Sequence, residues 1–303
     1  MCKEKHYHQL MRLEHEVERL LEKQTNISSI KSNVWFKVFF HILIQTTYDV
    51  IHLGIAARSY RSPVFSYVMP LIIVERLRYA QISVIIERQN ERARCLIAAL
   101  KLLVRANQPK LKFTSDIWQP YTVWEYEHLN WIRLIQGRLS ELHQCVNKCF
   151  GWSVIALFFS TFFTIVSNLF WCIEISLYKF HLGQFTYDAL TMLRLGTMVA
   201  VLLASAEKTK TNIMQISGLI FKLAKPLGNK AYNDLVSNLL LQCLHQRFII
   251  NVKGFFTLNI SLLGNMIASS VTYLLILVQF LVSEEVDTKQ TLGYKLMRNA
   301  TNG

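Results

Sequence analysis

The feature that most constrains the fold of this chain is an uncharged stretch near its C-terminus, from Leu258 to Leu281. A helix that crosses a bilayer needs about 20 consecutive, predominantly apolar residues, so this stretch predicts a transmembrane helix. Polar side chains are nevertheless spread along it, and five residues at helical spacing share one face: Thr272, Ile276, Gln279, Phe280 and Ser283. Such a face suits a pore wall or a helix–helix seam, and the periodicity alone favours the seam.

Further uncharged blocks predict that the whole chain is an all-α, polytopic membrane bundle. Of its 303 residues, 52% are hydrophobic and only 17% are charged, which is typical of a membrane protein. We predict five spans, arranged as a cytoplasmic amphipathic segment at 1–33, two spans at 34–86, a cytoplasmic helical region at 87–149, two spans at 150–206, a cytoplasmic loop and helix at 207–257, a final pore-type helix at 258–281 and an extracellular tail at 282–303.

Two of the cytoplasmic segments carry helical patterns. In the first, Leu10, Leu13, Val17 and Leu20 recur at a spacing of three and four, which predicts an amphipathic helix packed beneath the bundle rather than an oligomerisation helix. The 87–149 region is expected to hold two more amphipathic helices, near residues 92–105 and 121–146. It follows the second span, whose lipid-embedded part is expected to end at Glu75, Arg76 and Arg78 while its helix projects beyond the bilayer.

The distribution of positive charge predicts the orientation of the chain in the membrane. Of the 33 Lys and Arg residues, 23 fall on one predicted side and 6 on the other. Basic residues gather in cytoplasmic loops, so the N-terminus is expected inside and the C-terminus outside. The net charge of +13 therefore reflects orientation, and no nucleic-acid partner is predicted.

Polar residues also lie inside the other predicted spans, and Gln45, Asp49 and His52 of the first span are the ligand-facing candidates. Gln45, Asp49 and His52 share one helical face of the first span, and that face is too polar for lipid. Three interpretations stay open: the lining of a ligand pocket, a polar seam between helices, or the outer end of a shifted span in water. Asp188 and Arg194 of the fourth span are expected near its outer end or facing the bundle, with a pore position the less favoured alternative.

No pattern of catalytic or cofactor-binding residues is present. The spans carry no His-x-x-x-His, serine elbow or paired carboxylates, and the chain has no glycine-rich phosphate loop, so neither an enzyme nor a cofactor is predicted. Cys145 and Cys149 with His143 form a single helical turn of possible ligands without a second pair, and no metal site is predicted from them.

The final span carries a recognisable signature. Thr272-Tyr273, five apolar residues and Gln279-Phe280 match the pattern TYhhhhhQF, where h is an apolar residue, and Gly254-Phe255-Phe256 with Leu258-Asn259 precedes it. In both respects the chain resembles the insect gustatory receptor family. A weaker likeness at 142–151 extends the resemblance over about the second half of the chain.

The resemblance implies a ligand-gated, non-selective cation channel in the plasma membrane of a sensory neuron. Members of the family have seven spans, so this chain looks like one that lacks the first two. In a homo- or hetero-tetramer, Ile276 and Phe280 would form a hydrophobic gate, Gln279 a ring of amides, and Tyr273 would couple a small-molecule tastant to opening. Leu274 stands where the sugar-receptor branch has Glu, which favours bitter or other non-sugar cues. The alternatives are a non-conducting partner subunit, a truncated remnant and, less favoured, a transporter.

Overall fold

A computed structural model shows that the chain is built from long helices. It describes every residue except 1, 23–35, 37–38, 41, 49, 52–53, 56–63, 108–121, 179–181, 224–229, 247–249 and 302–303, and it leaves the side chains at 2–5, 64–69, 107, 177–178 and 284–301 undescribed. The helices are α1 (Cys2–Glu22), α3 (Val64–Asn107), α4 (Val123–Tyr178), α5 (Leu182–Phe221), α6 (Lys230–His245) and α7 (Ile260–Thr301), and residues 42–48 are also helical. The prediction of an all-α fold is therefore confirmed.

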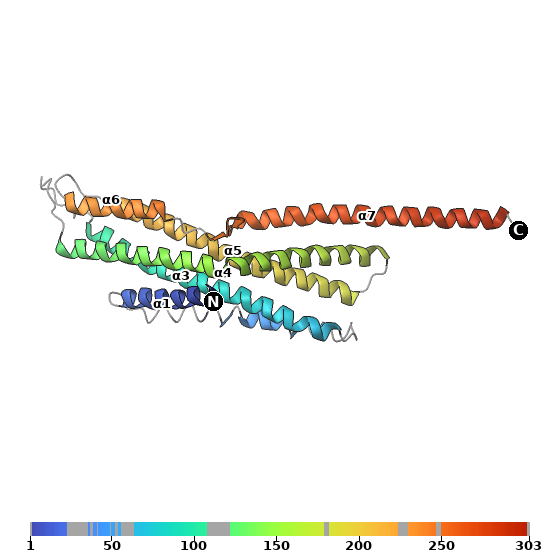
Figure 1. Ribbon diagram of the computed structural model, residues 1–303, viewed down its shortest axis with the longest axis horizontal. Coiled ribbons are helices and arrows are strands. Elements are labelled where there is room, and N and C mark those ends of the chain that lie inside the picture. The colour runs from blue at the N-terminus through green and yellow to red at the C-terminus, as the bar shows by residue number, and fades with distance from the viewer. Residues whose placement is uncertain are drawn as a thin grey trace.

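The centre of the molecule is a bundle of α3, α4 and α5, each of which packs against the other two (Figure 1). Helix α1 lies along α4, and α6 packs against α4 and α5 at the same end of the bundle. Helix α7 contacts α4 and α5 and then continues past the ends of the other helices to the C-terminus (Figure 1). The C-terminal part of α7 thus projects beyond the bundle (Figure 1).

Three of the described helices are long and apolar enough to cross a membrane: α4, α5 and the first part of α7, Ile260–Ser283. They contain the last three predicted spans. The first predicted span lies partly outside the described residues, and the second lies within α3 and stays a prediction.

The amphipathic helices expected near 92–105 and 121–146 are not separate elements. They are continuous with α3 and α4, so both helices extend the bundle well beyond the apolar segments. Helix α4 begins with a capping box, in which Thr122 Oγ1 accepts a hydrogen bond from the Glu125 amide at 3.2 Å and Glu125 Oε2 accepts one from the Thr122 amide at 2.8 Å.

The α1 helix is held to the bundle by an apolar seam. Leu10, Leu13, Val17 and Leu21 are all buried in the core shared with α3 and α4. The predicted seam was right except at its last position, because Leu21 completes it while Leu20 is only partly buried. Trp131 of α4 fixes the end of this seam by donating from Nε1 to the carbonyl oxygen of Leu20 at 3.1 Å.

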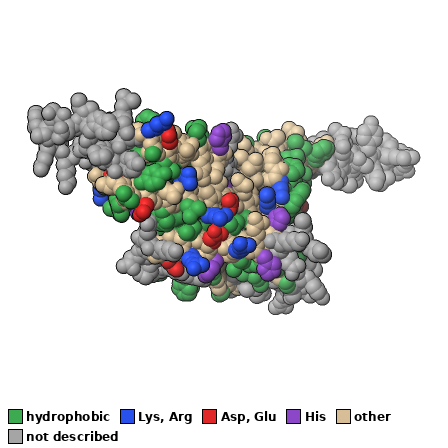
Figure 2. Space-filling model, turned by 60° about the vertical axis from the view of Figure 1, so that its left-hand side comes forward, with side chains coloured by type: hydrophobic (Ala, Val, Ile, Leu, Met, Phe, Trp, Pro, Cys, Tyr) green, Lys and Arg blue, Asp and Glu red, His purple; other side chains and the backbone are tan. Residues whose placement is uncertain are grey.

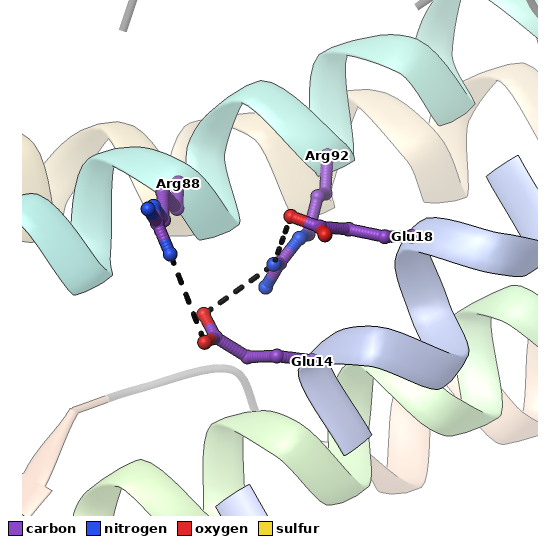
Figure 3. Close-up of polar contacts among 4 residues, drawn as sticks. All are labelled: Glu14, Glu18, Arg88 and Arg92. Carbon is purple, nitrogen blue, oxygen red and sulfur yellow. Dashed lines mark hydrogen bonds and ion pairs between the residues drawn. The ribbon is translucent and has the colours of Figure 1, made fainter. Parts of the chain in front are cut away.

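A polar cluster of α1 and α3 lies beside that seam (Figure 3). Arg92 of α3 donates from Nη2 to Glu14 Oε1 and to Glu18 Oε1, each at 3.3 Å, and Arg88 Nη1 lies 3.8 Å from Glu14 Oε2. When the end of the molecule that carries α1 and α6 is turned forward, its surface mixes acidic, basic and His side chains among apolar ones (Figure 2). Charged groups of both signs therefore gather at this end.

A tight hairpin links the bundle to α7. Strands β1 (Asn251–Val252) and β2 (Phe256–Thr257) pair antiparallel, and the turn between them places Lys253 and Gly254 at φ values of 53° and 83°. A positive φ is easily adopted by Gly and costs other residues free energy, which explains the glycine of the GFF lead-in.

Candidate functional site

The signature residues of α7 lie on its outer surface in the single chain. Tyr273, Ile276 and Phe280 are 55%, 43% and 70% exposed, and Gln279 and Thr272 are exposed as well. Only 6% of the apolar segment of α7 is buried, compared with 39% for α4 and 44% for α5. The face predicted from periodicity is thus free to meet another chain, lipid or water. Both interpretations of this face, a helix–helix seam and a pore wall, agree with its exposure.

Tyr273, although partly exposed, and the nearby Ser270 attach α7 to its own bundle. Tyr273 makes an edge-to-face contact with Phe162 of α4, with ring centroids 5.7 Å apart. Ser270, one turn before it, is 4% exposed and faces α4 and α5. Tyr273 thus contributes to the contact between α7 and α4, and the coupling role that the resemblance implies for it stays a prediction.

The GFF and LN residues that precede the last span have local structural roles. Phe256 packs on Phe158 of α4 with ring centroids 5.4 Å apart, and Leu258 is 3% exposed. Asn259 caps α7, since its Oδ1 accepts a hydrogen bond from the Leu262 amide at 3.0 Å. These residues set the position and direction in which α7 leaves the bundle.

A pocket of about 640 Å³ lies between α3, α4 and α5, and we call it the α3–α4–α5 pocket. Its size falls in the range of small-molecule sites, and its lining mixes apolar groups with hydroxyls, an amide and charges. The lining residues are Leu71, Ile72, Val74, Glu75, Arg78, Ser153, Ala156, Leu157, Ser160, Thr164, Asn168, Tyr187, Thr191, Arg194 and Leu195.

Charged groups of opposite sign meet in this pocket. Glu75 of α3 and Arg194 of α5 both line it, and Arg194 is only 4% exposed. One oxygen of Glu75, Oε1, is buried and has no hydrogen-bond partner among the described residues. Beside the pocket, the hydroxyls of Tyr79 and Thr161 share a hydrogen bond of 2.7 Å that joins α3 to α4. The pocket thus offers a buried acceptor and a buried cation to a polar ligand.

The sequence assigned these residues differently. The sequence places Glu75 and its basic neighbours at the end of the lipid-embedded part of the second span. In the structure, Glu75 lines the pocket between α3, α4 and α5. For Asp188 and Arg194 it decides among the alternatives, because both side chains are buried within the bundle, at 6% and 4% exposure. The signal for Glu75 was the same one used elsewhere, an ionisable residue inside a helical apolar pattern.

The ligand-facing candidates of the first span are only partly described. Gln45 is 9% exposed, and its Oε1 is buried without a hydrogen-bond partner among the described residues, but it does not line the α3–α4–α5 pocket. Asp49 and His52 lie outside the described residues. Their role as ligand contacts stays a prediction.

The His143 and Cys145 side chains have other partners. His143 Nδ1 lies 3.0 Å from Gln89 Oε1 of α3, and Cys145 Sγ donates to the carbonyl oxygen of His6 in α1 at 3.3 Å. These contacts join α4 to its neighbours, so both residues have structural roles at this end of the bundle.

Long apolar helices and a pocket that three of them line define a polytopic α-helical membrane protein. The family model described as 7tm Chemosensory receptor matches residues 2–283, and the chain belongs to this family.

Two curated relatives from Drosophila melanogaster show the same relationship. The chain is 32% identical to "Gustatory receptor 23a" over 212 residues, which cover 69% of this chain and 56% of the relative. It is 26% identical to "Putative gustatory receptor 2a" over 263 residues, which cover 78% of this chain and 60% of the relative. The chain thus spans less than two thirds of the length of these two relatives.

Proposed function

We propose that this chain is a gustatory receptor that opens a cation pore when a small-molecule tastant binds. The observation that carries the proposal is the exposed signature face of α7, which is long enough to span a membrane yet barely buried by its own chain. In a tetramer the last helices would line a central pore, with Ile276 and Phe280 as a hydrophobic constriction and Gln279 as a ring of amides that replaces part of the hydration of an ion.

The α3–α4–α5 pocket would be the tastant site. A buried carboxylate oxygen and a guanidinium suit a ligand with a hydroxyl or amine at one position and an acceptor at another. Leu274, where sugar receptors carry Glu, favours bitter or other non-sugar ligands. Binding opens the gate only if the ligand has a higher affinity for the open state than for the closed state. The contact of Tyr273 with Phe162 links α7 to α4, which lines the pocket, and would transmit a change in the pocket to the gate.

The proposed site in the cell is the plasma membrane of a sensory neuron, with the N-terminus inside and the C-terminus outside. The charge distribution supports this orientation, and α1 and α6 lie at the end of the bundle opposite to the end beyond which α7 projects (Figure 1). Assembly as a homo- or hetero-tetramer with other receptors belongs to the same proposal.

The test is ligand-evoked cation current in cells that express this chain, alone and together with a full-length receptor, screened with plant alkaloids and sugars. Gln279→Ala and Ile276→Ala should change current amplitude or ion permeability, whereas Val278→Ala, on the opposite side of α7, should not. Glu75→Gln should shift the effective ligand concentration without a change in permeability.

Two outcomes would contradict the proposal. A chain that reaches the surface and stays silent in both conditions would be a subunit without a pore role. Current that is indifferent to Gln279→Ala and Ile276→Ala in a co-expressing cell would assign the pore to the partner alone.

A further inference from the structure

A second pocket lies on a different side of the bundle from the α3–α4–α5 pocket. It has a volume of about 340 Å³ and lies between the helical segment at 42–48, α3 and α5, and we call it the α3–α5 groove. It shares no lining residue with the α3–α4–α5 pocket. Its lining consists of Phe40, Ile42, Ile44, Ala80, Ser83, Val84, Glu87, Val201, Ser205 and Lys208.

The chemistry of this groove changes along its length. On α3 the lining passes from Ala80 through Ser83 to Glu87, and on α5 it passes from Val201 through Ser205 to Lys208. Both helices run toward the end of the molecule that carries α1 and α6 (Figure 1), so the apolar ends coincide and the charged ends coincide. With a rise of 1.5 Å per residue, the step from apolar to charged lining takes about 10 Å.

The apolar part of the groove opens to the surface of the molecule. Phe40, Ile42 and Val201 are 53%, 49% and 41% exposed, although they lie on apolar segments of the chain. Surfaces of this kind within a membrane face hydrocarbon, so an acyl chain has direct access to the groove.

The charged part of the groove has a cation available for a head group. Lys208 is exposed and forms no ion pair with any described residue, whereas Lys210, two residues further, is paired with Glu207 at 3.3 Å. Glu87 and Lys208 also lie where the predicted cytoplasmic boundary of the membrane crosses α3 and α5. At that depth a lysine reaches phosphate groups, and the Ser83 and Ser205 hydroxyls can donate to ester oxygens.

We propose that the α3–α5 groove is a binding site for one membrane glycerophospholipid of the cytoplasmic leaflet. An acyl chain occupies the apolar part between Ile42, Ile44, Ala80 and Val201, and the phosphate lies against Lys208. The lipid contacts both α3 and α5, which also form the tastant pocket, so it stabilises one arrangement of these helices. The proposal requires the membrane-spanning bundle but not a pore.

The test uses the full chain purified in a non-ionic detergent and native mass spectrometry with added dioleoylphosphatidylserine, an anionic phospholipid. The wild-type chain should retain one lipid per protomer. Lys208→Gln should lower the affinity about fivefold, the usual contribution of one lysine at a membrane surface, and Lys208→Arg should restore it. Ala80→Phe should fill the groove and abolish retention.

Matched controls separate the site from general effects. Lys210→Gln removes a charge from the same helix outside the groove, and Ala98→Phe adds the same ring to an exposed position of α3, so both should bind as the wild type does. Equal affinity in Lys208→Gln and Lys210→Gln would overturn the proposal. So would equal retention of dioleoylglycerol, which has the same chains without a phosphate. Neither result depends on ion current, so the proposed channel activity can fail separately.

Discussion

The attachment of α1 to α3 gives a prediction whose size follows from the structure. Arg92 is 6% exposed, and its Nη1 is buried without a hydrogen-bond partner among the described residues. Its Nη2 makes the two 3.3 Å contacts with Glu14 and Glu18 (Figure 3). These two carboxylates of α1 are therefore the principal compensation for a buried positive charge on α3.

The double substitution Glu14→Gln with Glu18→Gln keeps the shape of both side chains and removes both charges. Loss of the partners of a buried ion costs about 3–5 kcal/mol, because the remaining charge stays desolvated. The lower end applies here, since the Glu18 side chain is 36% exposed and Arg88 at 34% exposure can turn to water. A loss of about 3 kcal/mol in the docking of α1 corresponds to roughly a 100-fold increase in its open population.

Hydrogen exchange of the α1 amides, measured on the purified full chain in detergent, reports that open population directly. Peptides that cover residues 10–21 should exchange on the order of 100-fold faster in the double variant, while peptides of α5 keep their rates. Glu16→Gln is the control on the same helix, because its ion pair with Arg138 at 3.2 Å is 36–38% exposed and should contribute at most about 1 kcal/mol. Equal rates in the two variants would refute the argument that burial makes the Arg92 cluster strong.

Three further outcomes follow from single positions. Leu100 is buried, and Leu100→Ala should lower the free energy of unfolding by about 2–5 kcal/mol in thermal denaturation. Leu102 on the same helix is 61% exposed, so Leu102→Ala should change the free energy of unfolding by no more than about 0.5 kcal/mol. Gly254→Ala should cost about 1–2 kcal/mol in the same assay, because its φ of 83° strains any side chain. Burial raises the pKa of Cys243 from 9.0 to about 11, so at pH 7.4 its alkylation, followed by peptide mass, should be about 100-fold slower than in the denatured chain.

Local sequence patterns predicted the helices well, because helical periodicity is a property of neighbouring residues. The Leu10, Leu13 and Val17 seam is buried as predicted, and the last apolar stretch forms α7. The same reasoning divided α3 and α4 incorrectly. A change from apolar to amphipathic composition was interpreted as a new helix, but no Pro or cap interrupts the backbone at that point, so each helix continues.

The α3–α4–α5 pocket could not be predicted in the same way. It depends on which faces of three helices meet, and Glu75 and Arg194 are separated by more than a hundred residues of sequence. Ionisable residues inside apolar patterns were a usable signal, and they indicated that Arg194 and Asp188 lie near the outer end of their span or face the bundle. They marked Glu75 only as the end of the lipid-embedded part of the second span, because its basic neighbours are also typical of a membrane boundary.

The last helix shows what the single chain leaves open and which residues decide it. The hydroxyl groups on α7 cost little free energy in lipid, because they are hydrogen-bonded within the helix. Thr272 donates to the carbonyl oxygen of Ala268 at 3.0 Å, and Ser270 donates to that of Met266 at 2.8 Å. The exposed amides of Asn265 and Gln279 have no such partner among the described residues. Fourteen residues at 100° per residue place them about 40° apart on one face and about 21 Å apart along the axis. Hydrocarbon cannot satisfy either amide, so this face of α7 must meet water or a second polypeptide, and the amides rather than the apolar signature residues impose that requirement.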